Sequence, residues 1–156
     1  NTSEKTIEKA KEIFNNSGSS IVNVKKEIDG FILNRLQGAL LNEAMRLYSQ
    51  GYANSDEIDA TIRDGLGLRW AFMGPFETID LNAPGGIRDY MSRYGSIYTE
   101  MAKNQTQVPD WSDKMGEKLE IERRKILPKN QLEERAKKRN LLLKSLRKVK
   151  IENGEV

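Results

Sequence analysis

Two polar side chains, each in a segment rich in apolar residues, are the best candidates for chemistry in this sequence. The first, Asn34, follows Phe31-Ile32-Leu33 in a segment of helical periodicity, between its apolar stripe and its exposed side. Asparagine lowers helix propensity, and its amide both donates and accepts hydrogen bonds. Asn34 therefore either hydrogen-bonds to a ligand or satisfies a nearby backbone group. Gly38, one turn later, leaves the backbone open to close approach.

The second candidate is Arg69, a single cation flanked by Leu68 and Trp70. A guanidinium in such surroundings needs an anionic partner, a hydrogen-bond network or water. Its planar fork suits two-point contact with a carboxylate or phosphate. The alternative to a ligand is a structural ion pair with an acid such as Asp64 or Glu77, and the sequence alone leaves both interpretations open.

The composition excludes several kinds of site. The 156 residues are enough for one ordinary domain and contain no histidine and no cysteine. The commonest general base, thiol nucleophile and zinc ligands are therefore missing, and no metal site is expected. The sequence has no apolar run of roughly 18 residues, as a membrane span requires. Because its first 15 residues are polar and of mixed charge, we expect that they do not form a signal peptide. We expect a cytoplasmic protein without membrane contact. The first residue, Asn1, suggests a processed chain or an excised piece.

Charge is distributed unevenly along the chain. Residues 1–109 carry 12 basic and 14 acidic side chains, whereas residues 110–150 carry 14 basic and 7 acidic ones. A basic segment can bind nucleic acid. Here the basic residues alternate with Glu and Leu instead of clustering with aromatic residues, which favours the solvated face of a helix. We therefore expect no nucleic-acid partner.

Apolar periodicity predicts a mostly helical chain with a single strand at residues 20–24, which has no partner in the sequence. Asn54 and Glu57 form a potential capping box, and Pro75 suits the first turn of a helix. Residues 65–75, rich in glycine, are predicted to be a loop. The helices are expected near residues 2–17, 31–50, 54–64, 75–81, 87–101, 111–126 and 130–150.

This order of elements predicts an all-α helical bundle of five to seven helices from about residue 28, preceded by a short βα remnant. Ile87, Met91, Tyr94, Tyr98 and Met101 form one stripe with spacings of four, three, four and three residues. Such a stripe is more typical of a core or a subunit interface than of a cofactor site. We therefore expect a homodimer.

Two longer motifs resemble a known family. Residues 27–44, EIDGFILNRLQGALLNEA, are similar to the signature that opens the C-terminal domain of 3-hydroxyacyl-CoA dehydrogenases. Residues 58–83, IDATIRDGLGLRWAFMGPFETIDLNA, resemble the lambda-crystallin branch, whose enzymatic members are L-gulonate 3-dehydrogenases. The resemblance is strong from Lys25 to Ala102 and weaker to Lys150. The wider family has a shorter glycine-rich stretch before its Met-Gly-Pro-Phe-Glu.

The resemblance implies a part of an enzyme that oxidises a secondary alcohol with NAD. Family members hold the catalytic His–Glu pair, a Ser and the dinucleotide-binding glycines in a Rossmann domain, and an Asn of the helical domain completes the site. Asn34 matches that Asn. Because the helical domains pair as dimers, Arg69 is expected to reach the neighbouring active site and clamp the carboxylate of a sugar acid. Gly65-Leu66-Gly67-Leu68 lies between helices, so it is given no cofactor role.

The same resemblance implies the domain organisation. Residues 1–27 correspond to the last helix and strand of an NAD-binding Rossmann domain, residues 28–150 to the helical substrate and dimerisation domain, and residues 151–156 to a tail. A chain with this content is expected to be inactive by itself. Two alternatives remain: a 3-hydroxyacyl-CoA dehydrogenase of fatty-acid oxidation, and a structural crystallin-like or dimerisation module without catalysis.

Overall fold

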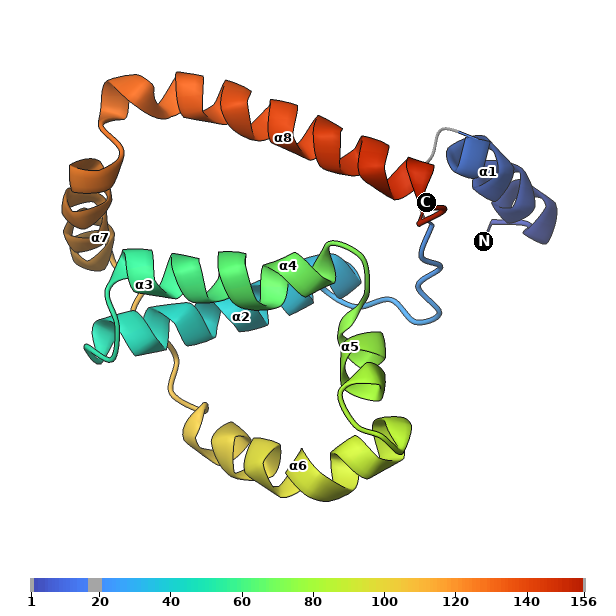
Figure 1. The fold of residues 1–156 in the computed structure, drawn as a ribbon, viewed down its shortest axis with the longest axis horizontal. Coiled ribbons are helices and arrows are strands. Elements are labelled where there is room, and N and C mark those ends of the chain that lie inside the picture. Colours follow the sequence, from blue (N-terminus) through green and yellow to red (C-terminus); the bar gives the residue numbers. More distant parts are fainter. Residues whose placement is uncertain (1, 17–20, 156) are drawn as a thin grey trace. The chain divides into compact units, whose positions relative to one another are not determined.

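A computed structural model of the chain describes residues 2–16 and 21–155 (Figure 1). The described residues form helices and no strand, which confirms the all-α prediction. They divide into two compact units, residues 1–35 with 136–156 and residues 36–135. The helices are α1 (Glu4–Asn16), α2 (Phe31–Ser49), α3 (Ser55–Ala60), the π-helix η1 (Thr61–Leu66), α4 (Gly67–Trp70), α5 (Pro75–Leu81), α6 (Gly86–Asn104), α7 (Asp113–Ile126), the 3-10 turn η2 (Lys129–Gln131) and α8 (Leu132–Glu152).

The predicted strand at residues 20–24 is wrong for the part that the structure describes. Residues 21–24 have no regular secondary structure, and Ser20 lies outside the described residues. A β-branched run becomes a strand when a neighbouring strand accepts and donates its backbone hydrogen bonds, and the described chain offers none. The preceding helix is confirmed as α1, and the Ser3 side chain accepts a hydrogen bond from the backbone N–H of Thr6 at 3.3 Å.

Helix α2 follows a left-handed turn and ends at a glycine. Gly30 has φ +80° and Phe31 has φ +50°, so the helix begins at Phe31. Gly51, with φ +76°, ends it as predicted, and its N–H donates to the Tyr48 carbonyl at 3.1 Å. The buried residues of α2 are Met45 and Tyr48, in its second half. The first half is exposed, although the sequence predicts a continuous buried stripe.

Residues 55–70 form one uninterrupted helical run through α3, η1 and α4. Asn54 begins it with the predicted capping box: its side chain accepts from the Glu57 backbone N–H, and the Glu57 side chain accepts from the Asn54 backbone N–H. The loop predicted at residues 65–75 is therefore wrong up to Trp70. Glycine inside a helix costs only about 1 kcal/mol, which packing can offset. We call this element the 55–70 run.

Helices α5 and α6 pack against each other. Pro75 occupies the first turn of α5, as predicted, and Thr78 is buried beneath it. The Asp80 carboxylate accepts a hydrogen bond from the Ile87 backbone N–H at 2.6 Å, which ties α5 to the start of α6. Gly86 has φ +74°, and a Cβ there would lie 2.8 Å from Asp80 Oδ1. The sharp turn between the two helices therefore requires glycine.

Helix α7 begins after Ser112, whose hydroxyl accepts from the Met115 N–H at 3.4 Å. The basic helix α8 contains no buried residue, and its leucines at 141, 142 and 143 are exposed. The 3-10 turn η2 precedes it, so Asn130 lies within the helical segment instead of capping α8. None of the described helices is long and apolar enough to span a membrane.

Candidate functional site

Asn34 lies in the first turn of α2, because the helix begins at Phe31. Its side chain is exposed and makes no hydrogen bond to any described residue. A Cβ at Gly30 would lie 3.8 Å from Asn34 Cβ, so the glycine turn closely precedes the amide. The alternative that Asn34 satisfies a nearby backbone group therefore finds no support, and the amide is available to another molecule.

Arg69 lies in α4 and is exposed, and within the described chain its side chain has no hydrogen bond and no ion pair. Asp64, one of its two expected partners, pairs instead with Arg63 through contacts of 2.9 and 2.7 Å. This pairing lowers the pKa of Asp64. The other acid, Glu77, forms no ion pair with Arg69. The structural ion pair considered for Arg69 is therefore absent from the described residues.

Arg69 lines an open cavity of about 650 Å³ between the end of the 55–70 run, α5 and α6. The walls are mainly apolar and aromatic, and we call this space the aromatic cavity. Its lining includes Leu66, Arg69, Trp70, Phe76, Ile79, Asn82, Tyr90, Met91 and Tyr98. Several of these side chains are well exposed, among them Phe76 at 74% and Met91 at 62%. The cavity therefore offers an apolar surface with one free guanidinium.

Two tyrosines of α6 form the polar part of the aromatic cavity. The hydroxyls of Tyr90 and Tyr98 lie 2.6 Å apart, and the rings of Tyr90 and Tyr94 have centroids 4.8 Å apart. The hydrogen bond with Tyr98 raises the pKa of Tyr90, while the nearby charge of Arg69 acts in the opposite direction. None of the residues of this stripe is buried within the described chain, so of the two expected roles, core or subunit interface, the stripe does not form a core here.

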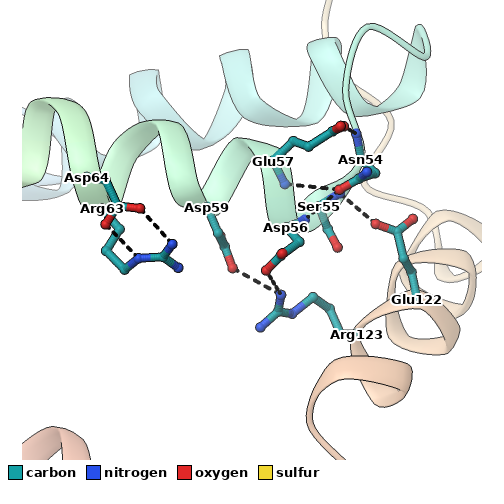
Figure 2. Close-up of polar contacts among 9 residues, drawn as sticks. All are labelled: Asn54, Ser55, Asp56, Glu57, Asp59, Arg63, Asp64, Glu122 and Arg123. Carbon is teal, nitrogen blue, oxygen red and sulfur yellow. Dashed lines mark hydrogen bonds and ion pairs between the residues drawn. The ribbon is translucent and has the colours of Figure 1, made fainter.

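At its other end, the 55–70 run is held by α7 (Figure 2). The Glu122 carboxylate accepts hydrogen bonds from the Ser55 backbone N–H at 2.6 Å and from the Tyr48 hydroxyl at 3.1 Å. Hydrogen bonding by Ser55 is the main reason why the pKa of Glu122 is lowered. Burial, followed by the neighbouring carboxylate, raises the pKa of Tyr48. Glu122 thus joins α7 to both α2 and α3.

Arg123, the next residue of α7, faces two aspartates of α3 (Figure 2). Its guanidinium lies 3.2 Å from Asp59 Oδ2 and 3.9 Å from Asp56 Oδ1, and its side chain is 28% exposed. No sequence pattern indicates the roles of Glu122 and Arg123, because the residues that each of them contacts lie more than 60 positions away in the sequence. In the sequence, these two residues are only adjacent charged residues within an amphipathic helix. Such a pair by itself indicates the solvent-exposed face of the helix.

The described residues offer no cradle for a dinucleotide and no cluster of metal-binding side chains. Gly65 and Gly67 lie inside the 55–70 run, where the backbone N–H of Gly67 donates to the Ile62 carbonyl. A phosphate cradle needs free N–H groups at the start of a helix, after a strand. Asn34 and Arg69 belong to different compact units, so the structure describes each in its own surroundings.

Comparisons with known proteins agree with these features. Residues 30–128 match the family model described as 3-hydroxyacyl-CoA dehydrogenase, C-terminal domain. Rabbit lambda-crystallin is 38% identical over 151 residues, which cover 96% of this chain and 47% of the rabbit protein. A rat lambda-crystallin homolog is 45% identical over 98 residues, covering 63% of this chain and 30% of its own length. L-carnitine dehydrogenase of Pseudomonas putida is 41% identical over 115 residues, which cover 73% of this chain and 36% of the Pseudomonas protein.

The chain thus spans less than half the length of these curated relatives. The family match begins at Gly30, directly at the turn before Asn34, and includes the whole 55–70 run and its anchor on α7. The helical fold and the sequence relationship support the same assignment. The chain belongs to the 3-hydroxyacyl-CoA dehydrogenase C-terminal domain family.

Proposed function

We propose that this chain is the helical part of an NAD-dependent dehydrogenase that acts on a 3-hydroxy carboxylate, with L-gulonate as the expected substrate. Residues 28–150 would complete the substrate site and form the dimer interface. NAD supplies the hydride acceptor, and it would bind to a part of the enzyme other than the described residues. Alone, the chain would be inactive.

The observation that carries the proposal is the free guanidinium of Arg69. An exposed arginine without an ion pair in the described chain, at the rim of an apolar cavity, is suited to a carboxylate that arrives with a ligand. A sugar acid has such a group next to its reacting end. L-Carnitine, named in one relative, is also a 3-hydroxy acid with a carboxylate. Both substrates share the chemistry that Arg69 would recognise.

The role proposed for Asn34 is to hydrogen-bond the reacting oxygen or the catalytic histidine of the complete enzyme. Its exposed amide can donate to an oxygen on which charge develops, and its place in the first turn of α2 gives it a fixed backbone. Asn34 would thereby orient the secondary alcohol, while Arg69 would hold the acid group.

A homodimer is the second part of the proposal. Exposed apolar side chains line α6, including Ile97 at 51%, Tyr98 at 53% and Met101 at 43%. A run of this kind is typical of an interface with another protein. A second copy seated on this face would cover it and would carry Arg69 towards the neighbouring active site. Sedimentation of the chain at micromolar concentration should give twice its monomer mass.

Two other functions are possible for the family. A 3-hydroxyacyl-CoA dehydrogenase would bind an acyl thioester, whose chain gains nothing from a guanidinium beside it. A structural role, as the name lambda-crystallin suggests for one relative, would require neither Asn34 nor Arg69. The exposure of both polar groups therefore favours the hydroxy acid dehydrogenase.

The experiment compares substrates with and without a carboxylate in the complete enzyme. Arg69→Ala should lower kcat/KM for L-gulonate about a hundredfold, because the anion loses a two-point contact that also orients it. The same change should leave the rate with a 3-hydroxyacyl thioester nearly unaltered. Arg63→Ala is the matched control, since Arg63 is also exposed but is already paired with Asp64.

Asn34→Ala should lower kcat about a hundredfold with any substrate that the enzyme accepts, as expected for the loss of one donor to the reacting oxygen. Unchanged kinetics in both Arg69→Ala and Asn34→Ala would overturn the proposed sites. An enzyme that oxidises only the thioester would favour the acyl-CoA alternative.

A further inference from the structure

The side chains of the 55–70 run point in different directions before and after its π-helical middle. Its first half directs Ile58 and Ile62 towards a cavity shared with α2 and α7. Its second half directs Leu66, Arg69 and Trp70 towards α5 and α6, in the aromatic cavity. One straight helical run thus serves two different faces of its compact unit.

A regular α-helix would not do this. Arg69 follows Ile62 by seven residues and Ile58 by eleven. At 3.6 residues per turn, both separations return to within about 20° of the same direction. In an uninterrupted α-helix, Arg69 would therefore share the face of Ile58 and Ile62, which is directed towards α2 and α7.

The π-helix Thr61–Leu66 removes this alignment. A hydrogen bond that spans five residues instead of four includes one extra residue in the turn. The side chains after the π-helix therefore lag behind their positions in a regular α-helix by the rotation of one residue, about 100°. The lag turns Arg69 by about 100° away from the face of Ile62, and Arg69 lines the aromatic cavity. The direction of Arg69 therefore depends on the π-turn.

Gly67 is the residue that permits the π-turn to close. Its N–H donates to the Ile62 carbonyl, and a Cβ at Gly67 would lie 2.9 Å from that same oxygen. The obstacle is backbone and cannot swing away. Gly67 has φ −63°, so glycine is needed here for close approach and not for backbone conformation. At Gly65, by contrast, an added Cβ meets no atom within 4 Å.

We propose that the π-turn at residues 61–66, closed by Gly67, sets the register that aims Arg69 into the aromatic cavity, which makes Gly67 a positioning residue for substrate specificity. This inference rests on the proposed role of Arg69 as a carboxylate clamp. The register itself is a property of the chain and can be tested without any activity.

The first test measures the register through Trp70, which neighbours Arg69 and lines the same cavity. The chain contains two tryptophans, so Trp111→Phe leaves Trp70 as the single reporter. In this background, Gly67→Ala should shift the Trp70 emission maximum and alter its quenching by acrylamide, while far-ultraviolet circular dichroism retains the helical signal. Gly65→Ala is the matched control and should leave both fluorescence measurements unchanged.

The second test measures the consequence for catalysis in the complete enzyme. Gly67→Ala should raise KM for L-gulonate about tenfold and change kcat little, because misdirecting the guanidinium weakens binding of the anion. In an Arg69→Ala background, Gly67→Ala should cause no further rise. A merely structural defect would instead add to the effect of Arg69→Ala.

Should Gly67→Ala fail to fold, deletion of Gly65 tests the same register without adding a Cβ, since it takes one residue out of the turn. Unchanged Trp70 fluorescence in the folded variants would overturn the inference. Additive effects of Gly67→Ala and Arg69→Ala on KM would overturn it as well. If Arg69→Ala alone leaves KM unaltered, the clamp is wrong, and the Trp70 measurement still decides whether the π-turn sets the register.

Discussion

The two ends of the 55–70 run differ in whether their polar groups have partners within the described chain. At the Ser55 end, the Glu122 carboxylate of α7 accepts a hydrogen bond from the Ser55 backbone N–H. Arg123 of α7 forms ion pairs with the aspartates of α3 (Figure 2). At the Trp70 end, the guanidinium of Arg69 has no such partner in the described chain. Polar groups that are satisfied internally stabilise the fold, whereas a free cation beside an apolar cavity is available to a ligand. The comparison therefore separates an anchoring end from the end at which we propose that a ligand binds.

The largest loss of stability is expected for Glu122→Ala. Its carboxylate accepts from two well-buried groups, the Ser55 N–H and the Tyr48 hydroxyl, whose residues are 7% and 5% exposed. Both donors would lose their acceptor, and buried donors without partners are costly. Urea unfolding should show a clearly lower midpoint. Glu120→Ala serves as the control, because Glu120 is 58% exposed and lies 3.9 Å from Arg124. An unaltered midpoint in Glu122→Ala would contradict the anchoring role.

A smaller loss, about 1 kcal/mol in the free energy of unfolding, is expected for Arg123→Ala, because its ion pairs with Asp59 and Asp56 are partly exposed. A double-mutant cycle with Asp59→Ala measures the pair directly. If the two single changes add without coupling, Arg123 acts through its packing alone.

The pH dependence of stability provides a third test. The pKa of Glu122 is lowered in the folded chain, so its contribution is present near neutral pH and is lost as the pH falls below about 5. The pKa of Tyr48 is raised, so its contribution is lost as the pH rises above about 10. Glu122→Gln should flatten the acid slope and Tyr48→Phe the alkaline slope of the thermal midpoint. If a variant shows the same slope as the unaltered chain, the pH dependence of stability in that range comes from other titratable groups.

The smallest effect on stability is expected at the Trp70 end. Arg69→Ala should change the free energy of unfolding by no more than about 0.5 kcal/mol, because the side chain is exposed and has no ion pair in the described part of the chain. The same variant carries the large kinetic effect predicted above. A marked loss of stability in Arg69→Ala would erase the difference between the two ends and favour a structural role for the guanidinium.

Sequence patterns predicted the local elements where the signal is local. The capping box of Asn54 and Glu57, Pro75 in the first turn of α5 and Gly51 after α2 all depend on residues within a few positions of one another, and all are confirmed. The strand is wrong at residues 21–24 and the loop is wrong at residues 65–70, because a strand needs a distant partner and glycine breaks a helix only when nothing else supports it.

The sequence by itself determined the helical class, the family and the identity of the candidate residues Asn34 and Arg69. Composition and motif spacing carry this information, since it depends on neighbours in the chain. The tertiary structure decided that Asp64 pairs with Arg63 and leaves Arg69 free, and that Glu122 and Arg123 hold α3. It also decided that Gly67 closes a π-turn which rotates Arg69 towards the aromatic cavity. These features depend on the backbone path and on contacts across many residues, which no short sequence pattern encodes.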